Sequence, residues 1–310
     1  MGEGVSDSAP VGAGTRAGFV ALIGAPNAGK STLLNALVGQ KVSIVTHKVQ
    51  TTRALLRGIV IHKNAQIVFV DTPGIFAPRR RLERAMVTTA WGGAADADVV
   101  ALLIDAKKGL TDEDRTILEK LCEFPAEREL VLVLNKVDIV KRDTLLALTK
   151  EANELARFSR TFMVSALKGD GVPDLLDHFA AAMPVSPYLY PADQMTDLPL
   201  RFLAAEITRE KLTLRLHDEL PYRTTVETEK WTETKKGVRI DQTIYVERDS
   251  QRKIVLGKGG ETIKAISMAA RVDIAKLIEK PAHLFLFVKV RENWSDDPER
   301  YREMGVEFPK

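Results

Sequence analysis

The stretch Gly24-Ala25-Pro26-Asn27-Ala28-Gly29-Lys30-Ser31 decides the fold of the first half of this chain. It is a full match to the pattern G-x4-G-K-[ST], in which backbone N–H groups wrap phosphate, the lysine reaches the β- and γ-phosphates and the serine binds Mg²⁺. A predicted strand at Phe19–Ile23 precedes the stretch and a predicted helix at Ser31–Val38 follows it, which is the context that such a motif requires. The sequence therefore predicts a nucleoside triphosphate site with Mg²⁺, to which we assign Gly24, Ala25, Pro26, Asn27, Ala28, Gly29, Lys30, Ser31 and Thr32.

Outward from this loop, apolar runs alternate with helical stretches. The predicted strands are Ile67–Val70, Val99–Ile104, Leu130–Leu134 and Phe162–Val164, and the predicted helices are Thr111–Cys122, which opens on a Thr-Asp-Glu-Asp cap signal, and Asp143–Phe158. Such an alternation forms a parallel sheet covered by helices on both faces, with ligand loops at the carboxyl ends of the strands. We expect an α/β P-loop domain with a mostly parallel sheet over residues 18–183.

A second motif, Asp71-Thr72-Pro73-Gly74, directly follows the predicted strand that ends at Val70. A carboxylate at this point holds Mg²⁺, usually through water, and the glycine N–H senses the γ-phosphate. We therefore expect Asp71 and Ser31 to bind the metal. The nucleotide site also includes Asp71, Thr72, Pro73, Gly74 and Ile75.

A third motif, Asn135-Lys136-Val137-Asp138, decides which base is bound. Guanine offers two donors, N1–H and N2–H, which the Asp138 carboxylate accepts together, whereas adenine would turn an acceptor toward it. Charged hydrogen bonds of this kind contribute about 1.5–3 kcal/mol each, so the motif favours GTP over ATP. The Lys136 stem is expected to lie against the purine, and Ser165-Ala166 to close the base pocket with a backbone N–H.

In this order, the three motifs resemble those of the translation-factor-related small GTPases. The resemblance places Thr51-Thr52 in the first switch loop, where one threonine reaches Mg²⁺ in the GTP state. We favour Thr52, directly before Arg53, as the metal ligand. The resemblance also implies a slow switch that alternates between GTP and GDP.

The side chain that catalyses hydrolysis is not evident. Ras-like proteins carry a water-positioning glutamine after Asp-x-x-Gly, but this chain has Ile75 at that position. Lys30 and Asn27 are the remaining candidates. Because some GTPases with a hydrophobic residue here use K⁺ near a P-loop asparagine, K⁺ activation at Asn27 is a hypothesis.

Composition divides the chain of 310 residues into two domains. Residues 1–17 are rich in Gly, Ala and Ser and are predicted to be a disordered tail. Four prolines within 184–199 exclude a helix there and indicate a stiff linker. Residues 200–310 are predicted to form a separate α+β domain, whose elements are Arg201–His217 (helix), Thr224–Thr234 and Val238–Glu247 (strands), Glu261–Ala270 (helix) and His283–Arg291 (strand).

Overall, 45% of the residues are hydrophobic and 28% are charged, which excludes fibrous and disordered chains. The lone cysteine, Cys122, indicates a reducing compartment and is expected to be a small buried hydrophobe. No apolar run approaches the roughly 18–20 residues of a membrane span. We expect a cytoplasmic protein.

The net charge is only +3, but the whole excess lies in residues 200–310. It is concentrated in Arg252–Lys276, which holds six basic residues against two acidic ones. Within this stretch lies Gly257-Lys258-Gly259-Gly260, a Gly-x-x-Gly loop between two predicted helices, as in KH domains that clamp about four nucleotides. The predicted RNA-binding residues are Lys253, Gly257, Lys258, Gly259, Gly260, Lys264 and Arg271, with Arg252 as a further candidate.

With both halves in view, residues 18 to 308 resemble the bacterial ribosome-assembly GTPases of the Era family. Further stretches carry this resemblance: Gln50-Thr-Thr-Arg53, Tyr190–Asp197, Glu206–Lys211 and Glu219-Leu-Pro-Tyr222. It implies a P-loop GTPase domain followed by a type II KH domain, with GTP or GDP and Mg²⁺ as cofactors. It also implies binding to the 3′ end of 16S rRNA and a role in 30S subunit assembly. We expect a monomer, and nothing in the sequence would anchor the peripheral membrane association sometimes attributed to the family.

Two other functions stay open. The chain could be a GTP-dependent RNA-binding scaffold in which hydrolysis is incidental. A tRNA-modifying GTPase would need further catalytic domains and a reactive cysteine.

The basic run Arg79-Arg80-Arg81 is better interpreted as a solvated helix start than as a contact to RNA.

Overall fold

The computed structural model describes residues 14–48, 51–292, 294, 297–303, 305–306 and 308. They divide into two compact units. The N-terminal unit extends to Gln40 and includes Leu56–Asp71 and Trp91–Asp197; the C-terminal unit comprises Lys41–Leu55, Thr72–Ala90 and the chain from Leu198 onward. Two segments of the first half of the sequence, a loop and a loop with the start of a helix, therefore group with the second half. Of the tail predicted over 1–17, residues 1–13 lie outside the described part of the chain.

The N-terminal unit contains a six-stranded sheet in the order β2-β3-β1-β4-β5-β6. All neighbouring strands are parallel except β2, which pairs antiparallel with β3. The predicted mostly parallel sheet is thus confirmed, although β2 was not predicted and β1 begins inside the predicted tail. The strands are β1 (Arg16–Ile23), β2 (Leu56–His62), β3 (Ala65–Asp71), β4 (Val99–Asp105), β5 (Glu129–Asn135) and β6 (Arg160–Val164).

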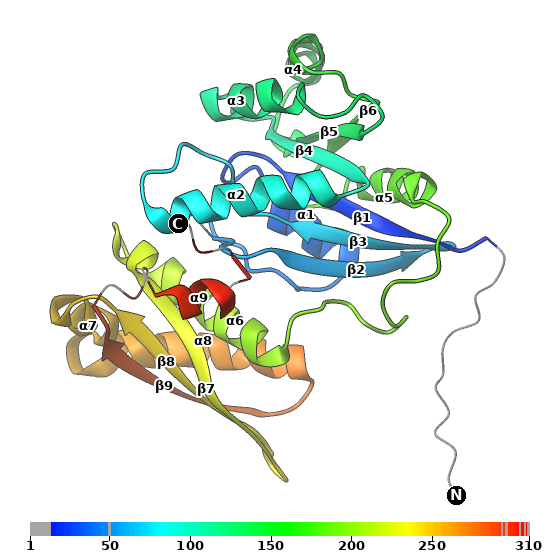
Figure 1. Cartoon of the computed structure of the whole chain (residues 1–310). Helices are drawn as coiled ribbons and strands as arrows, with labels where there is room; N and C mark the ends of the chain where they lie inside the picture. Colours follow the sequence, from blue (N-terminus) through cyan, green and yellow to red (C-terminus); the bar gives the residue numbers. More distant parts are fainter. Residues whose placement is uncertain are drawn as a thin grey trace, which may run out of the picture. The chain divides into compact units, whose positions relative to one another are not determined.

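Helices flank this sheet (Figure 1). α1 and α5 contact each other and both contact β2 and β3, so they cover the same face. The predicted cap signal of α3 is confirmed, because Thr111 Oγ1 accepts from the Asp114 N–H at 3.2 Å while Asp114 Oδ2 accepts from the Thr111 N–H at 3.0 Å. The helices are α1 (Lys30–Val38), α3 (Asp112–Leu121), α4 (Arg142–Leu155) and α5 (Val172–Ala182), with a short 3₁₀ turn η1 (Val137–Ile139).

The proline-rich stretch contains no helix, as predicted, and up to Asp197 it runs along the N-terminal unit. Gln66, fully buried on β3, accepts from the Leu189 and Tyr190 N–H groups at 2.7 and 2.9 Å and donates to the Tyr190 carbonyl at 2.7 Å. An ion pair of 2.6 Å joins Arg57 to Asp197. These contacts hold the stretch in place against the sheet.

The C-terminal unit has a three-stranded sheet in the order β7-β8-β9, in which β7 and β8 are antiparallel and β8 and β9 parallel. α6 packs on β7 and α8 packs on β9, so both helices cover one face. This order confirms the predicted helix–strand–strand–helix–helix–strand pattern of a KH domain. The elements are α6 (Leu200–Arg215), η2 (Leu220–Arg223), β7 (Thr224–Thr234), β8 (Gly237–Val246), α7 (Asp249–Leu256), η3 (Lys258–Gly260), α8 (Glu261–Ile278) and β9 (Ala282–Val290).

The end of the chain packs against the start of α2 (Arg81–Asp96), within the C-terminal unit. Met86 of α2 shares a buried cluster with Trp294 and Tyr301, the latter in α9 (Pro298–Glu303). Glu83 accepts from the Arg79 and Arg80 N–H groups at 2.7 and 3.0 Å, so the basic run does form the start of a helix.

One prediction is wrong: Cys122 is exposed rather than buried. It follows the last residue of α3, where its thiol donates to the Leu118 and Leu155 carbonyls at 3.4 and 3.2 Å. Within the described residues, no helix combines the length and the apolar character needed to cross a membrane.

Candidate nucleotide site and nucleic-acid interface

The predicted phosphate loop joins β1 to α1, and its geometry requires glycine at position 29. Gly29 has φ +101°, in the left-handed region, and a Cβ there would lie 2.1 Å from Asn135 Nδ2. Any side chain would therefore collide with the base-recognition loop. The close approach brings the two motifs together at the carboxyl ends of β1 and β5.

Lys30 is the first residue of α1 and is 6% exposed. Its ammonium group donates to the Gly24 and Ala25 carbonyls at 2.9 and 3.0 Å, so it lies inside the loop. Burial lowers the pKa of Lys30 to about 8, and the charges of Asp71 and Asp114 only partly oppose this shift. A buried cation whose charge is only partly balanced by nearby carboxylates can bind the negative charge of a polyphosphate.

Ser31 and Asp71 meet as predicted, with the Ser31 hydroxyl 2.7 Å from Asp71 Oδ2. Asp71 is fully buried at the end of β3. No group of three or more Asp, Glu, His or Cys side chains among the described residues would hold a metal ion alone. This donor set fits Mg²⁺, which protein sites usually bind through one or two carboxylates together with substrate phosphates.

Asn135 ties the phosphate loop to the base loop. The side chain is 2% exposed; its Nδ2 donates to the Ala28 carbonyl at 2.8 Å, and its Oδ1 accepts from the Lys136 and Ala166 N–H groups at 2.8 and 3.0 Å. The N–H of Ala166, which belongs to the pair Ser165-Ala166 predicted to close the base pocket with a backbone N–H, is thus bonded to Asn135. Asn135 therefore ties the two loops together, and Asp138 stays the residue predicted to contact guanine.

Asp138 lies in η1, directly after β5, and faces the third loop of the site. Hydrogen bonds from Ser165 and Lys168 lower the pKa of Asp138, with the Ser165 contribution the larger, so the carboxylate is charged at neutral pH. The Lys168 ammonium lies 3.3 Å from the carboxylate. Lys168 was not predicted, because a lysine two residues beyond Ala166 in a loop carries no distinctive pattern.

Asp105 was not predicted as a site residue either. It ends β4, and its Oδ2 accepts from Lys136 Nζ at 2.6 Å, while the same ammonium donates to the Asn27 carbonyl at 2.9 Å. These contacts fix the lysine stem that is predicted to lie against the purine. An acidic residue at the carboxyl end of a central strand was the available signal.

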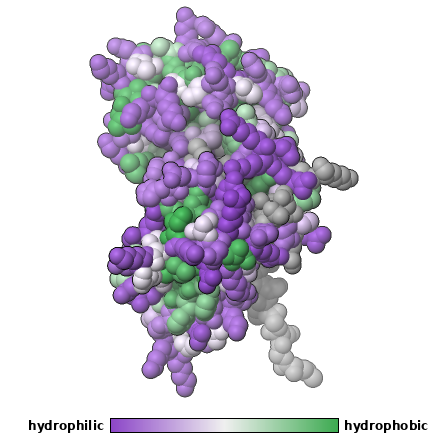
Figure 2. Space-filling view, turned by 90° about the vertical axis from the view of Figure 1, so that its left-hand side faces the viewer, coloured by the Kyte–Doolittle hydropathy of each residue, from purple (hydrophilic) through white to green (hydrophobic). Residues whose placement is uncertain are grey.

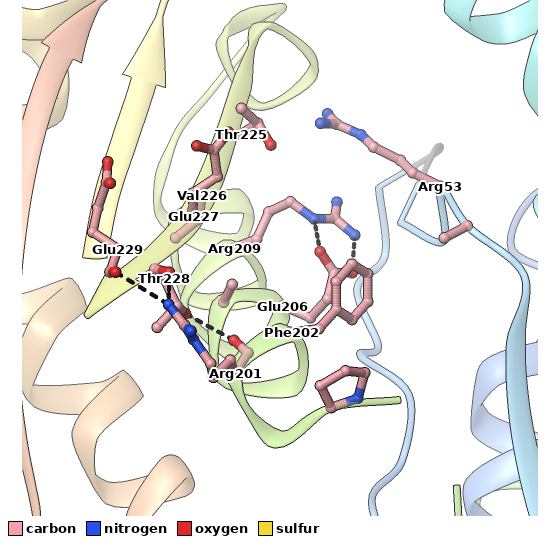
Figure 3. Close-up of a pocket in the computed structure, with 13 residues that line it drawn as sticks. Arg53, Arg201, Phe202, Glu206, Arg209, Thr225, Val226, Glu227, Thr228 and Glu229 are labelled. Atoms are coloured by element: carbon pink, nitrogen blue, oxygen red, sulfur yellow. Dashed lines mark hydrogen bonds and ion pairs between the residues drawn. The ribbon is translucent and has the colours of Figure 1, made fainter. Parts of the chain in front are cut away.

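The predicted switch residues Thr52, Thr72, Pro73, Gly74 and Ile75 belong to the C-terminal unit. In that unit, Arg209 of α6 is held by Glu206, with Nε 2.7 Å from Oε1, and donates to the Thr51 carbonyl. Figure 3 shows Arg209 and Glu206 side by side, with Arg53 on the segment that faces them. Arg53 donates to the Thr224 and Pro221 carbonyls at 2.8 and 3.1 Å. The residues on both sides of Thr52 are therefore bonded to the α6–β7 region.

Glu210, next along α6, binds the same segment further upstream. It is 3% exposed and accepts from Lys41 Nζ at 2.6 Å and from the Val45 N–H at 2.9 Å. Burial disfavours its charged form, but hydrogen bonds from Lys211, Lys41 and the Val45 N–H outweigh burial and lower the pKa of Glu210. This carboxylate, which was not predicted, binds the segment Lys41–Leu55, which we call the first switch segment, to α6.

The Gly-x-x-Gly loop lies between α7 and α8, as predicted for a KH domain. Gly257 has φ +75°, and a Cβ there would lie 2.3 Å from Thr262 Oγ1, so the turn needs glycine. Gly259 and Gly260 complete the turn, also at positive φ. The predicted cations around the loop are at least partly exposed: Arg252, Lys253, Lys258, Lys264 and Arg271.

Apolar side chains are exposed beside these cations. Ile254 on α7 and Met268 and Val272 on α8 are 58%, 55% and 50% exposed. Figure 2 shows hydrophobic surface lying among hydrophilic side chains on one face of the molecule. Bases and phosphates need this combination of apolar and cationic groups.

Comparison with protein-family models supports both sites. Residues 19–136 match the family described as 50S ribosome-binding GTPase, and residues 219–295 match the KH domain. The first match contains the phosphate loop and ends within the base-recognition motif. The second contains the Gly-x-x-Gly loop.

Full-length relatives agree. The chain is 69% identical to a GTPase Era of Mesorhizobium japonicum over 95% of both chains, and 65% identical to one of Rhizobium meliloti over 100% of this chain and 99% of the relative. Two crystal structures cover 94% of this chain and 99% of their own at 36% identity: Era in complex with MgGDPNP and nucleotides 1506–1542 of 16S ribosomal RNA (TM-score 0.89), and a single-substitution variant of Aquifex aeolicus Era bound to GDP·AlF4⁻ (TM-score 0.88). The chain belongs to the Era family of GTPases.

Proposed function

We propose that this protein is a slow GTP-driven switch that binds the 3′ end of 16S rRNA and acts in 30S subunit assembly. One observation carries the proposal: a guanine-nucleotide site and a Gly-x-x-Gly loop flanked by exposed cations lie on a single chain. The related Era structure that holds both MgGDPNP and an rRNA segment supports the same combination.

At the nucleotide site, Lys30 would contact the β- and γ-phosphates. Ser31, Asp71 and Thr52 would hold Mg²⁺, which neutralises charge on the phosphates when bound. Asp138 would accept both guanine donors, and the fixed Lys136 stem would cover one face of the base. Hydrolysis at about 10⁻⁴ to 10⁻² s⁻¹, typical of unstimulated GTPases, would make the reaction a timer.

At the KH domain, the glycine loop would let the RNA backbone approach closely. Lys253, Lys258, Lys264 and Arg271 would meet phosphates, so affinity should fall as salt rises. Lys258→Asp should weaken RNA binding and its salt dependence while GDP affinity is unchanged. Unchanged RNA affinity would remove the loop from the interface.

Single-turnover hydrolysis tests the switch against the scaffold alternative. We expect an oligonucleotide of the rRNA 3′ end to change the hydrolysis rate, and RNA affinity to differ between the GTP-analogue and GDP states. The scaffold would show neither effect. If RNA does not change the hydrolysis rate and the bound nucleotide does not change the RNA affinity, the scaffold is the better description.

We also propose K⁺ activation near Asn27. Support comes from Ile75, whose buried hydrocarbon side chain offers no group to orient water. Hydrolysis should be faster in K⁺ than in Na⁺ at equal ionic strength. Equal rates would exclude this proposal.

Finally, we propose a cytoplasmic monomer with a GTPase domain at 18–183, a linker at 184–199 and a KH domain at 200–310. The contacts of Gln66 with Leu189 and Tyr190 support a linker fixed at its first part. Light scattering should give the mass of one chain, and sedimentation with 30S subunits should retain it in the subunit fraction.

A further inference from the structure

A cavity in the C-terminal unit lies between the end of α6, η2, α7 and the start of α8. Its volume is about 580 Å³, within the roughly 300–1,000 Å³ typical of sites that bind small molecules. Cationic side chains surround it, and none of them is used by the sites described above. They are Arg215, Arg223 and Arg248.

Two of these cations have no ion-pair partner in the described part of the chain: Arg215 and Arg248. Arg223 differs, because Glu247 lies 2.6 Å from its guanidinium group. Arginine guanidinium groups that line a concave surface without a carboxylate partner are typical of phosphate sites. Asp218 and Glu219 also line the cavity and limit its positive charge, so the cavity favours a single phosphodiester over a highly charged polyphosphate.

The cavity lies beside the Gly-x-x-Gly loop, because residues on both sides of the loop line it. Thr262, which a Cβ on Gly257 would meet, lines it, and so does Ile254, the most exposed apolar residue of α7. Gln251 fixes the start of α7 by accepting from the Glu247 and Arg248 N–H groups at 2.8 and 3.2 Å. The cavity therefore offers an apolar surface for a base and cations for a phosphate beside the loop.

The length of α7 sets the distance between the cavity and the Gly-x-x-Gly loop. Gly257 follows Arg248 by nine positions, which corresponds to about 13 Å at ~1.5 Å per residue. Stacked nucleotides advance by about 3.4 Å, so roughly four nucleotides, or fewer when extended, cover this distance. A strand gripped by the loop would reach the cavity within a few nucleotides.

We propose that this cavity is a second RNA subsite, which takes a nucleotide just outside the four held by the Gly-x-x-Gly loop and holds its phosphate with Arg215 and Arg248. The inference rests on the RNA-binding function proposed above. It assigns to these arginines a role that depends on the length of the RNA.

The test compares three single-stranded oligonucleotides of the rRNA 3′ end in the full-length protein: a core of about five nucleotides, and the core extended by about five on its 5′ side or its 3′ side. Arg215→Gln and Arg248→Gln should each weaken one extended RNA about five- to tenfold and reduce its salt slope by about 1, without changing the core. The matched control is Lys235→Gln with Lys236→Gln, which removes two exposed charges from the β7–β8 turn of the same unit. It should change none of the three affinities more than about twofold.

Lys258→Asp separates this inference from the proposed function, because it should weaken all three RNAs. If it weakens none, RNA binding through the loop fails. If it weakens all three while the arginine variants bind like wild type, only the second subsite fails. Equal weakening of the core and the extended RNAs by the arginine variants would also overturn the subsite, since it would indicate general attraction. Unchanged affinity for the core RNA shows that the C-terminal unit of each arginine variant is folded, and an unchanged melting profile shows the same for Lys258→Asp.

Discussion

Asn135→Ala offers the sharpest quantitative test of how the nucleotide site is assembled. The substitution removes three hydrogen bonds, of 2.8, 2.8 and 3.0 Å, two of them buried and one partly buried, and leaves the Ala28 carbonyl and the Lys136 and Ala166 N–H groups without their partner. At about 1 kcal/mol each, the expected loss in the free energy of unfolding is about 3 kcal/mol. For a unit of this size this corresponds to a fall in melting temperature of about 6–12 °C.

The effect should also appear in nucleotide binding. Without Asn135 the phosphate loop and the base loop are no longer tied, so the nucleotide must order them itself, and GDP affinity should fall at least tenfold (about 1.4 kcal/mol). Differential scanning calorimetry and fluorescence titration with a labelled GDP measure the two quantities.

Asn153→Ala is the matched control. Asn153 is an exposed asparagine on α4 whose Nδ2 donates to the Thr149 carbonyl at 2.8 Å. Its loss should cost less than about 0.5 kcal/mol and leave GDP affinity unchanged. If Asn135→Ala melts within about 2 °C of wild type and binds GDP within about twofold, the side chain does not tie the loops and the reasoning is refuted.

Three further predictions follow from the geometry. Burial lowers the pKa of Lys30 to about 8, and bound phosphates would raise it, so GDP binding at pH 8 should take up about half a proton. Calorimetry in buffers of different ionisation enthalpy measures this uptake. No uptake would contradict an ammonium group whose burial is only partly offset by nearby negative charge. The lowered pKa of Glu210 stabilises the fold above its unfolded pKa of 4.5, and this contribution is lost as pH falls through the lower folded pKa. Glu210→Gln should therefore cost about 2 kcal/mol at pH 7 and less at pH 3, and a cost that is the same at both pH values would exclude the ionised contacts. Gly257→Ala, which forces a Cβ to 2.3 Å from Thr262 Oγ1, should lower RNA affinity at least tenfold with GDP affinity unchanged, and wild-type RNA binding would show that the turn tolerates a side chain.

Much of the site could be predicted because its chemistry is local in sequence. The phosphate loop, Asp71 and the Asn135–Asp138 motif each lie at the end of an apolar strand, and a parallel sheet brings such ends together. The meeting of Ser31 with Asp71 at 2.7 Å and of Asn135 with Ala28 at 2.8 Å follows from this rule.

Contacts that depend on tertiary packing could not be predicted. Asp105 and Lys168 carry no motif, and their roles arise only where Lys136 and Asp138 come within reach. The short β-branched run Ile59-Val60-Ile61 within β2 is a signal for a strand, but it is too short to exclude a helix. Cys122 was expected to be buried because of its residue type, yet it follows the end of an amphipathic helix, where burial depends on the chain that comes next.

The grouping of the first switch segment with α6 was the least predictable feature. Arg53, Arg209 and Glu210 look like ordinary surface charges in the sequence, but all three are buried, with exposed fractions of 4%, 2% and 3%. Buried charges need partners, and their partners here include backbone groups far away in the sequence. No local pattern encodes such pairings.

The most direct test of the central claim is a crosslinking map. An oligonucleotide of the rRNA 3′ end that contains 4-thiouridine at successive positions would be irradiated with the full-length protein bound to a GTP analogue, and the modified peptides identified by mass spectrometry. The account predicts crosslinks within 252–276, around Gly257–Gly260. Crosslinks confined to the N-terminal unit, or to the sheet face opposite α6 and α8, would contradict it.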